Sequence, residues 1–111
     1  MGEGIEGLMF TFENIFTKIE DDRAIQRALR NIDRKDLVLA LRKAPADTKE
    51  KIFKNMSQSA SDMLKEDIDV MGPQKVQLVE EAQRKIVNVI KMMAKEGIIS
   101  FTSNKEEVDL V

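Results

Sequence analysis

Apolar residues recur along most of this 111-residue chain at steps of three and four, the spacing that places them on one face of an α-helix. Such stretches include Ile25–Ile32 and Leu37–Ala44, and the longest runs from about residue 74 to 96. The predicted packing positions of that long stretch are Val76, Val79, Gln83, Ile86, Ile90 and Met93. The pattern predicts an all-α fold, a compact domain of five to six helices with a long C-terminal helix and a short extended tail.

Polar caps and a glycine–proline pair indicate where these helices begin and end. Asp21 or Asp22, then Asp33, then Ser57 precede three of the helical stretches, and their side-chain oxygens can accept hydrogen bonds from free backbone N–H groups. Gly72–Pro73 predicts the end of one helix and the start of the last one. Glycine readily adopts the left-handed conformation that ends a helix, and proline suits a first helical turn.

The chain divides into one main domain and short flanking segments. Residues 1–8 are interpreted as the end of a preceding linker or helix, and residues 9–12 form a dense apolar cluster. Residues 13–101 are predicted to form the helical domain, with residues 98–101 extended. The acidic stretch 102–111 is expected to be a flexible tail.

Composition narrows the possible functions. The sequence contains no cysteine and no histidine, so the usual zinc ligands and the commonest catalytic base and thiol are missing, and we expect neither a cofactor nor a metal. The net charge of −2 offers no basic field for nucleic acid, and no apolar run is long enough to enter a bilayer. The acidic N-terminal start does not resemble a signal peptide. An interaction domain is therefore favoured over an enzyme.

Charge is concentrated on the predicted helix between Ser57 and Gly72. Four acidic residues and one basic residue lie there: Asp62, Glu66, Asp67, Asp69 and Lys65. At 100° per residue, the outward side is predicted to carry Ser59, Asp62, Glu66 and Asp69. The apolar arc is predicted to contain Ala60, Leu64, Ile68 and Met71, and Asp67 falls inside it. Asp67 is therefore expected to point inward and to need a partner.

On the pattern alone, the charged side of this helix is most simply a solvated surface. Alternation of charge between neighbouring helices also serves to hold them together. The residues by themselves therefore indicate a helical protein-interaction module. A generic adaptor is compatible with that pattern. An enzyme is a distant third interpretation, because the obvious acid–base pair, Glu66 and Asp67, points to two different faces.

Several blocks of the sequence resemble the flagellar motor switch protein family FliG. They keep the family's order and spacing over roughly residues 9–101. The blocks are Met9-Phe10-Thr11-Phe12-Glu13-Asn14, Asp21-Asp22-Arg23, Ile25-Gln26-Arg27, Leu37-Val38-Leu39-Ala40-Leu41-Arg42, Glu50-Lys51-Ile52-Phe53-Lys54-Asn55-Met56-Ser57, Leu64-Lys65-Glu66-Asp67, Gly72-Pro73 and Glu80-Glu81-Ala82-Gln83-Arg84-Lys85-Ile86. The resemblance is to the C-terminal part of a longer protein.

The resemblance implies a role in bacterial motility. It implies an armadillo-like six-helix domain at the cytoplasmic face of the inner membrane, in the flagellar basal body. Its implied partners are the cytoplasmic loop of a MotA-like stator protein, the switch protein FliM, and other FliG copies in a ring. It also implies a hinge that consists of Met9, Phe10, Thr11 and Phe12. A divergent paralogue or a non-motor adaptor is the alternative.

The resemblance further implies a ridge of charged residues that contacts the stator. Family positions with a positive charge fall on Arg42 and Lys75, and the family's acidic pair falls on Glu66 and Asp67. A third positive position falls on Ser59, which is neutral, so this sequence departs from the family pattern there. Lys43, beside Arg42, is a candidate to supply the missing charge.

Overall fold

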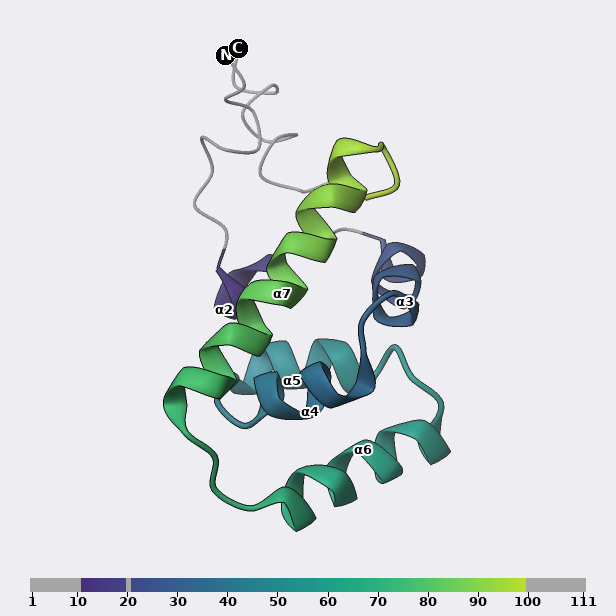
Figure 1. Cartoon of the computed structure of the whole chain (residues 1–111). Helices are drawn as coiled ribbons and strands as arrows, with labels where there is room; N and C mark the ends of the chain where they lie inside the picture. Colours follow the sequence, from purple (N-terminus) through teal and green to yellow (C-terminus); the bar gives the residue numbers. More distant parts are fainter. Residues whose placement is uncertain (1–10, 20, 100–111) are drawn as a thin grey trace.

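The computed structural model describes residues 11–19 and 21–99, and this part of the chain is built from helices (Figure 1). The helices are α2 (Phe12–Ile15), α3 (Asp22–Arg30), α4 (Arg34–Leu41), α5 (Ala46–Phe53), α6 (Gln58–Met71) and α7 (Val76–Lys95). The all-α prediction with a long last helix is therefore confirmed. The expectations for residues 1–8, for Met9 and Phe10, and for residues 100–111 lie outside the described residues.

Helix α4 lies at the centre of the domain, between α7 and α6. It packs against both helices, while α2 and α3 also pack against α7 (Figure 1). The prediction of a single apolar face on α4 is too narrow, because every residue of Leu37–Leu41 is buried. A helix that is covered on opposite sides buries its whole circumference.

Local capping signals are confirmed at two helix starts and fail at a third. The carboxylate of Asp21 accepts from the backbone N–H of Arg23, and the hydroxyl of Ser57 accepts from that of Ala60. Asp33 occupies the cap position of α4, but its side chain accepts no capping hydrogen bond. Asp36, in the first turn of the same helix, lies 4.0 Å from the ammonium group of Lys85 on α7.

The connection from α6 to α7 is longer than the sequence indicates. Gly72 has φ +69°, as predicted for a glycine that ends a helix. Pro73, however, does not open the next helix, because α7 begins at Val76 after the cap residue Lys75. The side chain of Val76 is 56% exposed, so its predicted place in the packing seam is wrong. Burial along α7 begins one turn later, at Val79.

Buried polar side chains connect the central helices. The Gln83 side chain on α7 donates to the backbone carbonyls of Ala40 and Lys43, at 3.0 and 3.3 Å. These carbonyls lie at the end of α4, where a helix leaves acceptors without partners in the helix itself. The hydroxyl of Thr48 donates to the Glu13 carbonyl at 3.0 Å and so links α5 to α2. Gln83, the polar residue among the predicted packing positions of α7, thus stabilises the end of α4.

We predict that Gln83→Ala lowers the free energy of unfolding by about 1–3 kcal/mol, because it removes a buried donor from two carbonyls. Gln77→Ala is the matched control, since Gln77 lies on the same helix and is exposed. Chemical denaturation of both variants measures the difference. Equal stabilities would contradict a structural role for the Gln83 amide.

Candidate functional site

Helix α6 presents an acidic outer surface. The four side chains predicted to face outward, Ser59, Asp62, Glu66 and Asp69, are all exposed. Its inner side buries Ser61 and Leu64 and partly covers Ala60, Ile68 and Met71. The predicted helical phase is therefore confirmed, and Glu66 points away from the domain.

The single cation of α6 is directed toward its neighbour α5. The Lys65 ammonium group lies over the Phe53 ring, 5.0 Å from the ring centre. A cation over an aromatic face is attracted by the negative charge of the π-system. This placement separates the positive charge from Glu66, although the two residues are adjacent in sequence. The outer surface of α6 is therefore dominated by carboxylates.

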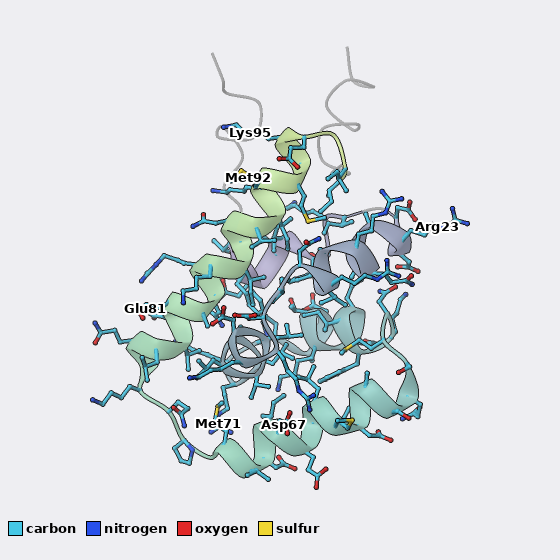
Figure 2. The ribbon with its side chains drawn as sticks, turned by 45° about the vertical axis from the view of Figure 1, so that its right-hand side comes forward. Arg23, Asp67, Met71, Glu81, Met92 and Lys95 are labelled. Carbon is cyan, nitrogen blue, oxygen red and sulfur yellow. The ribbon has the colours of Figure 1, made fainter. Side chains whose placement is uncertain are left out.

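Asp67 lies on the side of α6 that faces the rest of the domain (Figure 2). Its carboxylate oxygen Oδ2 accepts from Nε of Arg34 at 2.9 Å and also from Nη2 of the same guanidinium. The expectation that Asp67 needs a partner is confirmed. Its side chain nevertheless remains 42% exposed, so the pair forms near the surface and not in the core. The pair lies at the rim of the contact between α4 and α6, where water reaches it.

Arg42 is also turned toward α6. It is the C-terminal cap residue of α4, and its Nη1 lies 3.4 Å from the backbone carbonyl of Ile68. Arg34 and Arg42 therefore reach from the two ends of α4 to two consecutive residues of α6. Arg42 is only partly exposed, whereas its neighbour Lys43 is exposed.

The expected ridge residues occupy three elements. Ser59, Glu66 and Asp67 lie on α6, Arg42 ends α4, and Lys75 precedes α7 as an exposed cap residue. The contacts bring Arg42 and Asp67 to one stretch of α6, while Ser59 and Glu66 share its outer side. Sequence reasoning missed Arg34, whose partner lies 33 positions away. No local spacing connects residues so far apart.

Of the two described residues of the expected hinge, Thr11 is exposed and Phe12 is anchored in the core. Thr11 caps α2, and Phe12 is 3% exposed, with its ring edge-to-face against Phe16 at 5.8 Å between centres. Aromatic pairs in this geometry add to the stability gained from burial. Any movement at this segment therefore either occurs before Phe12 or carries α2 with it.

Surface hollows within residues 11–19 and 21–99 have volumes from about 200 to about 570 Å³. In this part of the chain, no group of three or more Asp or Glu side chains is placed to hold a metal ion. Within the same residues, no helix is both long and apolar enough to cross a membrane.

These features define a small all-helical domain that displays a charged helix. The family model for the FliG C-terminal domain matches residues 1–101, and the chain belongs to that family. The chain is 45% identical to the flagellar motor switch protein FliG of Borreliella burgdorferi, over all of the chain and 32% of the relative. It is 46% identical to that of Thermotoga maritima, over 89% of the chain and 29% of the relative. The chain thus spans about a third of these relatives.

Solved structures of the family share the fold. A crystal structure of a FliG fragment from H. pylori aligns with a TM-score of 0.79 and 36% identity, over 86% of this chain and 41% of that one. The structure of full-length FliG from Aquifex aeolicus aligns with a TM-score of 0.76 and 42% identity, over 84% of this chain and 28% of that one. The resemblance noted in the sequence is therefore confirmed.

We predict that Arg34 and Asp67 stabilise each other by about 0.2–1 kcal/mol, since the pair is partly exposed. A double-mutant cycle of Arg34→Ala and Asp67→Ala, followed by chemical denaturation, measures this coupling. The coupling is expected to decrease at high salt, where exposed charges are screened. Glu66→Ala is the control, because Glu66 faces water on the same helix. A coupling of zero at low salt would contradict the contact.

Proposed function

We propose that this chain is the stator-facing domain of a flagellar motor switch protein, and that it contributes to torque and to reversal of rotation. The observation that carries the proposal is the acidic outer surface of α6, where Glu66 is exposed and Lys65 is turned away. Membership of the FliG C-terminal domain family supports it.

The proposed contact surface is the charged ridge of Arg42, Ser59, Glu66, Asp67 and Lys75. A stator has to bind and release the rotor repeatedly, so a deeply buried interface would slow the cycle. Exposed charges instead give steered and rapidly reversible contacts. Their reach is about 8 Å at physiological ionic strength, so the two surfaces interact only when they nearly touch.

The proposed partners follow from the family. The ridge is proposed to contact the cytoplasmic loop of a MotA-like stator protein. The other proposed partners are FliM and further FliG copies, which form a ring with this chain. The chain then acts at the cytoplasmic face of the inner membrane, within the basal body. The work comes from ion flow through the stator, so the domain acts without catalysis of its own.

The segment Met9–Phe12 is proposed as the hinge between this domain and the preceding part of the protein. Burial of Phe12 supports a hinge in which α2 stays with the domain. In such a hinge, Phe12 keeps its place in the core.

A non-motor adaptor, or a divergent paralogue, is the second candidate function. The observation that favours it is neutral Ser59 at a position where the family carries a positive charge. Ser59 shares the outer side of α6 with Glu66, so the missing positive charge alters the surface that a stator would meet.

We predict that Glu66→Lys abolishes most swimming when this chain replaces the matching segment of FliG in a motile host. The fold should be preserved, because substitution of an exposed side chain changes stability by no more than about 0.5 kcal/mol. An opposite charge reversal in the stator loop should restore part of the motion. Glu50→Lys is the control, since Glu50 is an exposed carboxylate on α5. Swimming speed and melting temperature are measured for each strain and variant.

Two outcomes of this experiment would reject the ridge. One is normal swimming by a stably expressed Arg42→Ala, Glu66→Ala, Lys75→Ala triple variant. The other is an equal loss of swimming in Glu66→Lys and Glu50→Lys, because the effect would then reflect net charge and not position. The first outcome favours the adaptor.

We also predict that Ser59→Arg is tolerated in both stability and swimming. The side chain is exposed in the first turn of α6, so an arginine fits without repacking, and it restores the charge that the family carries there. Ser61→Arg is the contrasting variant, because Ser61 is 5% exposed and an arginine there would disrupt the packing of the inner side of α6. Melting temperature and swimming speed distinguish the two.

A further inference from the structure

The Arg34–Asp67 contact is asymmetric. Two nitrogens of the Arg34 guanidinium, Nε and Nη2, both donate to the single oxygen Oδ2 of Asp67. Within the described residues, the second oxygen of that carboxylate, Oδ1, accepts no hydrogen bond. The carboxylate is therefore held in a defined orientation by one oxygen, while the other stays available at a side chain that is 42% exposed.

Arg34 is well placed to orient the whole of α6. It is the first residue of α4, and the five residues from Leu37 to Leu41 fix that helix in the core. Helix α6 packs mainly against α4, and its chain leaves through Gly72, around which an added Cβ would meet no atom within 4 Å. Contacts with α4, the Arg34–Asp67 pair among them, are therefore the main restraint on the rotation of α6 about its axis.

Fixing Asp67 also fixes the direction of Glu66. Adjacent helical residues are separated by about 100° around the axis, so a rotation that releases Asp67 moves Glu66 by the same angle. The contact at Asp67 thus helps to keep the Glu66 carboxylate on the outer side. Arg42 donates to the backbone carbonyl of Ile68, the residue after Asp67, and so restrains the same part of α6.

We propose that Arg34 is a positioning residue for the charged ridge. It holds Asp67 by one oxygen, and the orientation of α6 that results keeps the Glu66 carboxylate on the outer side, where a cationic side chain of the partner can reach it. This inference rests on the proposed function, in which the ridge contacts a stator loop. Arg34 itself is expected to stay bound to α6 and not to touch the partner.

A distance measurement in the isolated 111-residue chain tests the positioning without any partner. The chain contains no cysteine, so spin labels attach only at introduced ones, here Ser59→Cys on α6 and Asn88→Cys on α7. Arg34→Ala is expected to broaden or shift the distance distribution between the labels. Lys35→Ala is the matched control, because it removes the same charge from the adjacent exposed position and should leave the distribution unchanged.

Two further variants make the measurement specific to the ion pair. Arg34→Lys keeps the charge with a single nitrogen and should restore part of the original distribution. The exchanged pair, Arg34→Asp with Asp67→Arg, should restore it more fully, because the contact between α4 and α6 is rebuilt with reversed charges. Identical distributions in Arg34→Ala and Lys35→Ala, with both variants folded, would overturn the proposal.

Swimming assays separate this inference from the proposed function. Arg34→Ala should reduce swimming severalfold while Lys35→Ala does not, and melting temperatures should be similar. If Glu66→Lys swims normally, the ridge itself fails, whereas the label distances still decide whether Arg34 orients α6. If Arg34→Ala changes the distances but swims like Lys35→Ala, the orientation of α6 does not matter for torque, and the functional part of the inference is wrong.

Discussion

Burial of α4 between α7 and α6 is the constraint on which the rest of the domain depends. Each large apolar side chain that is removed from water contributes about 1.5–3 kcal/mol, and α4 buries such residues around its whole circumference. The last carbonyl groups of such a helix have no partner in the helix itself, so other elements have to satisfy those that are buried. Gln83 of α7 does so at the carbonyl end of α4.

The same constraint explains why α6 is able to display charge. Because α4 already packs against α7, α6 is added on the opposite side of α4 and needs only one apolar side of its own (Figure 1). The remaining circumference is free for Asp62, Glu66 and Asp69. Carboxylates on one surface repel each other weakly in water, and removal of Lys65 to the Phe53 ring leaves that surface with a single sign.

Helix positions and phases were predictable because their signals are local. Asp21, Ser57 and Gly72 act on backbone groups within a few residues, and the 100° rotation per residue placed Glu66 outward. Contacts between distant segments were not predictable in this way. The Arg34 partner of Asp67, the Ala40 and Lys43 partners of Gln83, and the extra residues before α7 all depend on how helices pack. The ridge residues themselves came from family resemblance, since periodicity gives exposure but no partner.

Glu66 and Asp67 illustrate why adjacent charges on a helix should not be treated as one site. They differ by one position and by one methylene group, yet one faces water and the other faces an arginine of a buried helix. A weak and reversible contact gains specificity only if its charges keep a fixed geometry, because flexible charges lose entropy each time they bind. A carboxylate that stays paired within the domain can supply that geometry at small cost in stability, since the pair is partly hydrated. In the acidic pair, Glu66 therefore supplies the outward charge, and Asp67 connects α6 to Arg34 of α4. This connection helps to keep Glu66 in a fixed direction, although α6 packs against the domain mainly on one side.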